Sequence, residues 1–229
     1  MSKFARTLFV LRTLLSFGRY KVLKKNTEAV KVLFERFMRL GGIYVKFLQL
    51  IAIKEDLNSQ DYGAMKDTLA VFDDVRPEEL DIDHELSKQL GNKYGLIQRV
   101  DLMPFAQGSF AQVYAAELQD GTAVVVKVLR PSVRENLRFD MQLIGVAAKI
   151  IGSFRSNDFL DVKQLFAELR EMTLQETDYI AEAKNAQGMY EQYKNDSVIQ
   201  VPKTFMNLCT ETVIVQERVQ GIALTELMK

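Results

Sequence analysis

The residue whose type and position most clearly suggest a chemical role in this sequence is a lysine that ends an apolar strand. Lys127 follows Ala123-Val124-Val125-Val126, and Gly108 and Ser109 lie in a loop of small residues before the preceding strand. Small side chains let backbone N–H groups approach a phosphate closely. An ammonium removed from water costs several kcal/mol unless an anion meets it. The pattern predicts that Lys127 meets a carboxylate or a nucleotide phosphate. The alternative is an edge-strand lysine that extends to water.

The elements around Lys127 favour the first interpretation. Two runs rich in β-branched residues, GSFAQVYAAEL and TAVVVKVLRP, are joined by Asp120-Gly121, which is typical of a hairpin turn. A long helical stretch is predicted from about residue 133, with a break near 152–158, and two further strands are predicted in 198–222. A glycine-bearing hairpin, a strand lysine, a helix with a glutamate and two strands follow each other in a protein-kinase N-lobe. Glu182 is the expected partner of Lys127.

The N-terminal part is basic and helical. Residues 1–54 carry twelve lysines and arginines against two acids, a net charge of +10. Residues 2–17 repeat apolar side chains at helical spacing, namely Phe4, Leu8, Leu11 and Leu15. Such a helix can lie in the plane of an anionic membrane, or pack on the protein with a solvated basic side, or belong to an organelle transit peptide.

The next segment is also predicted to be helical. A helix over about 26–57 is interrupted by Gly41-Gly42, and its second part carries Lys46 and Gln49; short helices follow over 60–99. No apolar run reaches the roughly eighteen residues that span a bilayer. The single cysteine, Cys209, excludes a disulfide scaffold and a cysteine-rich zinc site, and the single histidine, His84, argues against histidine catalysis. No metal site is predicted.

Several ordered motifs in residues 30–229 resemble the UbiB/ADCK family of atypical kinase-like proteins, which is linked to ubiquinone biosynthesis. The family's Lys-x-Gly-Gln motif is similar to Lys46-Phe47-Leu48-Gln49, and its short acidic loop to Asp73-Asp74-Val75-Arg76-Pro77. Its alanine-rich nucleotide loop and following strand are similar to FAQGSFAQVYAAEL, and its Glu-x-Asp motif to Glu176-Thr177-Asp178.

The resemblance implies an α+β fold, a kinase-like N-lobe with an N-terminal helical extension. The expected domains are a basic helix over 1–25, a helical extension over 26–99 and the N-lobe over 100–229. It also implies an ATP site. The residues expected to contact the nucleotide are Ala106, Gly108, Ser109, Lys127, Glu182 and the backbone of Glu217 and Val219, with Gln216 as gatekeeper.

The resemblance implies a second set of residues with catalytic roles. These are Lys46, Gln49, Glu176 and Asp178, with Lys46 near the two carboxylates. Asp178 and Glu182 would share a helix face, whereas Glu176 would lie about 160° from Asp178 on a continuous helix, so both could face one site only if the helix is distorted. The alternative for Glu176 and Asp178 is a solvated acidic face.

The sequence departs from the family pattern in three respects. Leu48 replaces the motif glycine, and Gly108 stands in an otherwise alanine-rich loop. The catalytic Asp and the ligands of magnesium are expected only in a C-lobe, and the sequence stops at Lys229, just after a predicted helix N-cap at Thr225. Asp61-Tyr62-Gly63 precedes the lysine strand and is interpreted as a turn. An N-lobe without its C-lobe is expected to expose an apolar face and to be inactive alone.

Three functions remain open. The first is an atypical kinase/ATPase-family protein, here truncated, that binds ATP and acts in quinone-lipid metabolism. The second is a non-catalytic, pseudokinase-like module that binds a nucleotide or a partner, and the third is a helical lipid-surface protein. The expected partners are a nucleotide, an anionic membrane or lipid and a separate C-lobe, with no nucleic acid. The expected location is the cytoplasmic face of the inner membrane, or alternatively an organelle.

Overall fold

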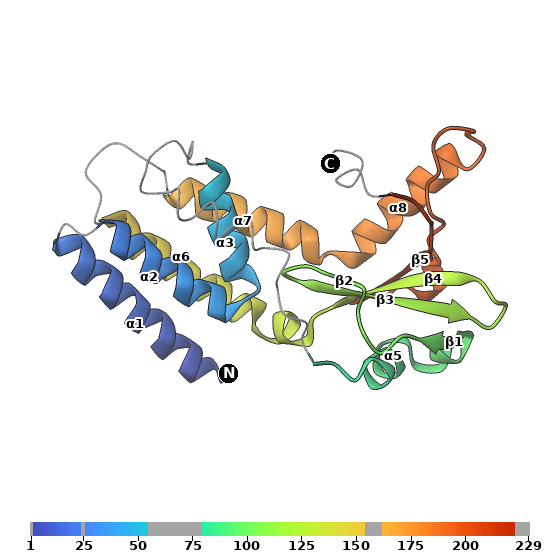
Figure 1. Ribbon diagram of the computed structural model, residues 1–229, viewed down its shortest axis with the longest axis horizontal. Coiled ribbons are helices and arrows are strands. Elements are labelled where there is room, and N and C mark those ends of the chain that lie inside the picture. The colour runs from blue at the N-terminus through green and yellow to red at the C-terminus, as the bar shows by residue number, and fades with distance from the viewer. Residues whose placement is uncertain (1, 24–25, 55–78, 154–161, 223–229) are drawn as a thin grey trace. The chain divides into compact units, whose positions relative to one another are not determined.

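The computed structural model describes residues 2–23, 26–54, 79–153 and 162–222 (Figure 1). These residues form two compact units. Within the described ranges, the helical unit draws on 2–23, 26–54, 108–110, 130–153 and 162–175, and the sheet unit on 79–107, 111–129 and 176–222. The chain therefore passes between the two units five times.

The sheet unit contains one antiparallel sheet of five strands. The strand order is β1-β3-β4-β5, and β2 pairs with β3 alongside β1. The strands are β1 (Ile97–Val100), β2 (Ala106–Gln107), β3 (Ala111–Leu118), β4 (Ala123–Leu129) and β5 (Val213–Glu217). The predicted β3–β4 hairpin is present: Gly121 adopts φ 81°, and Asp120 Oδ1 accepts a hydrogen bond from Thr122 N at 3.0 Å.

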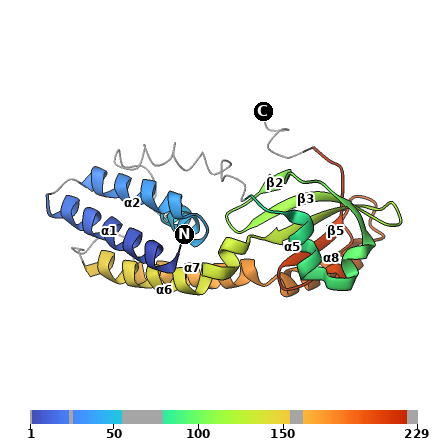
Figure 2. The same cartoon turned by 90° about the horizontal axis from the view of Figure 1, so that it is seen from below.

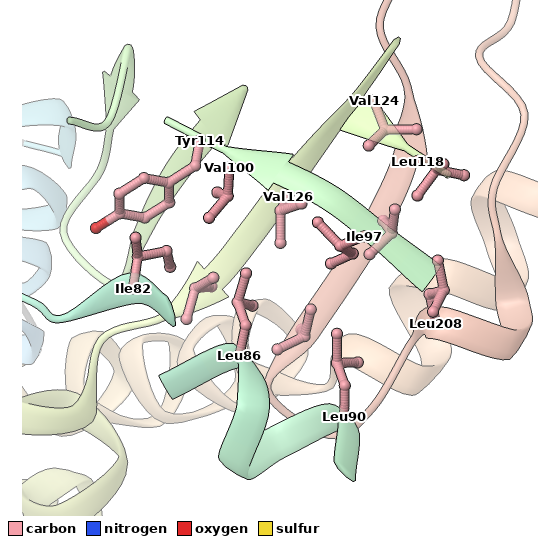
Figure 3. Packing of buried hydrophobic residues seen from close by; sticks show 13 residues of the cluster. Ile82, Leu86, Leu90, Ile97, Val100, Tyr114, Leu118, Val124, Val126 and Leu208 are labelled. Carbon is pink, nitrogen blue, oxygen red and sulfur yellow. The ribbon is translucent and has the colours of Figure 1, made fainter. Parts of the chain in front are cut away.

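One face of this sheet packs on helix α5 (Ile82–Leu90) to form the core of the unit. Ile82, Leu86 and Leu90 of α5 meet valines of β4 and β5 together with Tyr114 of β3 (Figure 3). Val124, Val126 and Val128 lie on this face, so the alternation of side chains along β4 directs Val125 and Lys127 to the other face. Burying each such side chain contributes at most about 1.5–3 kcal/mol.

Helix α8 (Tyr179–Tyr193) supplies the partner of Lys127 on the other face of the sheet, opposite α5, as the two views in Figures 1 and 2 show together. Two short 3₁₀ helices complete the unit, η2 (Gly91–Leu96) and η3 (Met206–Leu208). Helix α5 and Ile97 of β1, which lie in the predicted extension 26–99, contribute to the core of the sheet unit.

The helical unit is built from α1 (Lys3–Val22), α2 (Asn26–Leu40), α3 (Ile43–Lys54), α6 (Pro131–Ser153) and α7 (Val162–Thr177), whose last two residues belong to the sheet unit. The predicted break between α2 and α3 is present, because Gly41 and Gly42 adopt φ values of 67° and 53°. The rings of Phe37 and Tyr44 make an edge contact across this break, with their centroids 5.1 Å apart.

A buried ion pair ties α1 to α6. Arg6 binds the carboxylate of Asp140 through two nitrogens, and the bond from Nε to Oδ1 measures 2.8 Å. The hydroxyl of Tyr44 on α3 donates to the same Oδ1 at 3.2 Å. Burial, reinforced by the charge of Asp140, strongly raises the pKa of Tyr44 and keeps it protonated. Three helices are thus joined by one polar cluster.

Two sequence predictions need correction. The first of the two strands expected in 198–222 does not form: this segment meets β5 only through a bridge between Thr204 and Gln216. Pro202 has no N–H to give to a ladder, and the side chains of Val198 and Ile199 are exposed. The long helix expected to run beyond residue 158 is interrupted at Asp178, where α7 gives way to α8.

None of the helices in the described part of the chain is both long enough and apolar enough to cross a membrane.

Candidate nucleotide-binding site

Lys127 and Glu182 are in direct contact. Lys127 Nζ lies 2.6 Å from Glu182 Oε1 and 2.8 Å from Oε2, so the ammonium binds both oxygens of one carboxylate. The two side chains remain 30% and 40% exposed. The ammonium is therefore paired as the sequence predicts, but it is accessible rather than buried. A ligand can reach it without breaking the core.

The sheet fixes the position of Lys127. Its neighbours across the ladder are Val113 on β3 and Ile214 on β5, so the lysine lies on a central strand with hydrogen-bonded partners on both sides. The alternative of an edge-strand lysine is excluded. Val113 and Val125 are half-buried on this face, beside the ammonium. They provide an apolar floor next to a cation, which is the composition that a nucleotide base and its phosphates need.

The start of α8 fixes the position of Glu182. Asp178 is the N-cap: its Oδ1 accepts a hydrogen bond from Ala181 N at 3.0 Å, and its carbonyl accepts from Glu182 N at 3.0 Å. Glu182 therefore lies in the first turn of the helix, where a carboxylate is favoured by the helix dipole.

Tyr179 completes the surroundings of the ammonium. Its ring centroid lies 5.1 Å from Lys127 Nζ, within the range of a cation–π contact. The side chain is almost fully buried, and burial together with the negative charges of Glu182 and Glu176 raises the pKa of its phenol. A neutral ring on one side and a carboxylate on the other hold the ammonium in one orientation.

The Glu-x-Asp motif spans a helix break. Glu176 lies at the end of α7 and Asp178 in the cap position before α8, so the distortion required for both to face one site does occur. The expectation that Asp178 shares a helix face with Glu182 is wrong, because Asp178 precedes the helix and its carboxylate caps it. The catalytic roles inferred for Glu176 and Asp178 stay predictions.

The small-residue loop joins β2 to β3. Ala106 pairs with Val113, and both Ala106 and Gly108 are exposed, whereas Ser109 is half-buried. A Cβ built on Gly108 would meet no atom within 4 Å, and the φ of this glycine is not positive. The fold therefore does not require glycine at position 108.

The predicted hinge residues lie at the end of β5 and just beyond it. Glu217 ends this strand opposite Val124, and its backbone N–H donates to the carbonyl of Lys203 at 2.8 Å. Gln216 lies on the Lys127 face, opposite Val125, and its side-chain amide donates to Thr204 Oγ1 at 3.2 Å. Val219 lies two residues beyond β5 with an exposed side chain. The roles of Glu217 and Val219 in adenine binding stay predictions.

Lys46 and Gln49 lie on α3 in the helical unit, and both are half-buried. Leu48 between them is fully buried in the core of this unit. The predicted approach of Lys46 to Glu176 and Asp178 stays a prediction. Three other predicted features lie outside the described residues: the acidic loop Asp73–Pro77, the turn at Asp61-Tyr62-Gly63 and the N-cap Thr225.

No three acidic, histidine or cysteine side chains converge as a metal site within the described ranges.

Sequence reasoning identified Lys127 and Glu182 but not Tyr179 or the capping role of Asp178. The sequence marks the helix break at Asp178 only weakly, because QETDYIAEA contains no glycine or proline. Its only local indication of the break is an aspartate, a residue type that is favoured as a helix N-cap.

Comparison with known proteins agrees with this architecture. Residues 65–229 match the model of the ABC1 atypical kinase-like domain. The chain is 30% identical to a protein named "Probable protein kinase UbiB" from Tolumonas auensis, over 97% of this chain and 40% of that protein. It is 31% identical to an "Uncharacterized protein in hydrogenase 1 5'region" from Clostridium pasteurianum, over 90% of this chain and 38% of that protein.

A solved structure is also similar. The complex of Rv3197 with erythromycin from Mycobacterium tuberculosis has a TM-score of 0.55 and 25% identity, covering 92% of this chain and 53% of that one. The chain spans about 35–40% of the length of the curated relatives it matches. The resemblance to the UbiB/ADCK family is confirmed by the domain match and the UbiB relatives. This chain, with its antiparallel sheet, its strand lysine and its α8 glutamate, belongs to the ABC1 atypical kinase-like family.

Proposed function

We propose that the sheet unit binds ATP on its Lys127 face, as part of an atypical kinase/ATPase of the UbiB type. Lys127 contacts the nucleotide phosphates, and Glu182 and Tyr179 hold its ammonium in place. The loop with Ala106, Gly108 and Ser109 approaches the phosphates through its backbone, and the backbone of Glu217 and Val219 contacts adenine. Family membership and the resemblance to proteins linked to ubiquinone biosynthesis support a role in quinone-lipid metabolism.

The observation that carries the proposal is the two-oxygen contact between Lys127 and Glu182. A pair as exposed as this contributes only about 0–1 kcal/mol to folding, since water and salt screen it. A carboxylate and an aromatic ring that orient a lysine on a central strand therefore serve little purpose in stability. They are suited to positioning a cation for an anionic ligand.

Nucleotide-dependent thermal unfolding tests this proposal. ATP at about one hundred times its Kd should stabilise the native chain by about 2.7 kcal/mol, which corresponds to a rise in Tm of roughly 5–10 °C. Lys127→Ala should keep its own Tm within a few degrees of the wild type and lose the rise. Lys88→Ala is the matched control, because Lys88 is an exposed lysine on α5, on the other side of the sheet.

A full ATP-dependent rise in Lys127→Ala would overturn the site. Metal-dependent ATP hydrolysis, measured on the same samples, is informative in one direction: turnover that is lost in Lys127→Ala indicates a kinase or ATPase. ATP binding without turnover is expected of this chain under both candidate functions, because the catalytic Asp and the magnesium ligands are expected only in a C-lobe.

A further inference from the structure

Helix α1 is apolar on two different faces. Val10, Leu14 and Phe17 are buried against the rest of the helical unit. A second row of apolar side chains is exposed to solvent: Phe4 (78%), Leu8 (38%), Leu11 (45%), Leu15 (73%) and Val22 (74%). At about 100° per residue, these five positions fall within an arc of about 60°, centred about 120° from the buried row. We call them the outer stripe.

The outer stripe is held in its outward orientation by polar contacts on the inner side of α1. Arg6 is locked to Asp140 on α6. From α2, Arg36 Nη1 donates to the carbonyl of Arg12 and to the hydroxyl of Ser16, both at 3.1 Å. The packed face of α1 is therefore settled by a buried ion pair as well as by apolar contacts. Rotating the helix to bury the outer stripe would break this pair, which is unfavourable.

The charged residues that border the outer stripe are basic. No acid occurs between Lys3 and Val22. Arg12 and Arg19 lie along one edge of the stripe, within about 80° of Phe4, and both side chains are exposed. Lys3 lies at the angle of the buried row, and its ammonium is 5.8 Å from the ring of Phe139 on α6. An apolar row with cations along one edge complements a surface with an apolar interior and an anionic boundary.

We propose that the outer stripe of α1 docks in the plane of an anionic lipid surface. The apolar side chains enter the boundary between headgroups and acyl chains, and Arg12 and Arg19 contact lipid phosphates. From Phe4 to Val22 the stripe is about 27 Å long, and it lies along one side of a helix whose other side is packed, so the helix lies on the membrane. A second copy of the chain fits this face less well, because a two-fold contact would bring the same cations together.

Vesicle flotation of the full chain tests this inference. The chain should float with vesicles of phosphatidylcholine containing about 30% phosphatidylglycerol and stay at the bottom with phosphatidylcholine alone. Leu11→Ser with Leu15→Ser should weaken flotation at least about tenfold, and Arg12→Gln with Arg19→Gln should weaken it similarly and flatten its salt dependence. Val198→Ser with Ile199→Ser, at exposed apolar positions of the sheet unit, is the matched control and should float like the wild type.

Three results would overturn the inference. The first is equal flotation of the wild type on neutral and anionic vesicles, and the second is unchanged flotation of the Leu11/Leu15 variant. The third is a wild-type dimer, seen by sedimentation, that the Leu11/Leu15 variant dissociates while neither protein floats. The variants are expected to fold because every substituted side chain is exposed, and circular dichroism checks this. Lys127→Ala should float normally, so the outcome is independent of nucleotide binding.

Discussion

Position 48 lies inside the Lys-x-Gly-Gln motif of the family but carries a leucine with no exposed surface. The helical unit is packed around this side chain, and Phe47 beside it is also buried. We expect Leu48→Gly, which restores the family residue, to lower the free energy of unfolding by roughly 3–5 kcal/mol. Loss of a buried leucine leaves a cavity, and glycine within a helix adds about 1 kcal/mol. Urea unfolding measures the loss.

Gly108→Ala is the control for this prediction, since it introduces the residue type that is frequent in the nucleotide loop that the family resemblance implies. Its new methyl group has no neighbour within 4 Å, and the backbone there is not left-handed. The free energy of unfolding should change by less than about 1 kcal/mol. A similar cost for the two substitutions would contradict the packing explanation.

At this scale, the sequence predicted the residues whose position follows from periodicity. Lys127 was placed by the alternation of β4, and Glu182 by the order of the elements. Tyr179 and the cap at Asp178 depend on where a helix breaks, and the local sequence marks that break poorly. Leu48 was recognised as a departure, but its burial depends on contacts made by the whole helical unit.

The contact between α1 and α6 depends on a charged pair in an apolar setting. Removing one partner leaves an uncompensated buried charge, so Arg6→Met or Asp140→Leu alone should destabilise the chain by about 3–5 kcal/mol. The double variant should be less destabilised than either single one, because no charge is then left unpaired. Urea unfolding of the four proteins gives the coupling free energy.

Additive losses in this cycle would show that Arg6 and Asp140 act independently. Tyr44→Phe provides a graded control: it removes one hydroxyl hydrogen bond to Asp140 and should cost only about 1 kcal/mol.

Element by element, local signals predicted the hairpin at Asp120-Gly121 and the break at Gly41-Gly42, where the backbone itself requires particular residues. The four-residue strand β1 was not predicted, because its pairing with β3 is a long-range contact.

The segment 198–201 was predicted as part of a strand, but its tertiary contacts override that propensity. The outer stripe was predicted as one apolar side of α1, while its burial or exposure could come only from the packing of Arg6.

Over the whole molecule, three tyrosines set a common alkaline limit to stability. Burial and a hydrogen bond to Asp83 raise the pKa of Tyr94 from 10.0 to about 12, and burial raises the pKa values of Tyr44 and Tyr179. A raised folded-state pKa means that the neutral phenol is stabilised by folding. This stability is complete below pH 10 and is lost as the pH rises from 10 towards 12.

These tyrosines should therefore not affect how Tm depends on pH below pH 10. Above pH 10, their ionisation in the unfolded chain should make Tm fall steeply. Tyr94→Phe and Tyr44→Phe should each make the fall shallower, since each removes one group that loses a proton on unfolding. Tm curves between pH 8 and 12 measure the effect, and parallel curves for the wild type and both variants would refute it.

The passage of the chain between its two units has a consequence for synthesis on the ribosome. Arg6 and Asp140 are 134 residues apart, so at 5–20 residues per second the arginine emerges roughly 7–27 s before its partner. The nascent sheet likewise waits for β5, which follows α6, α7 and α8. Neither unit can be completed early, and a basic, apolar N-terminal segment stays available to other surfaces throughout this interval.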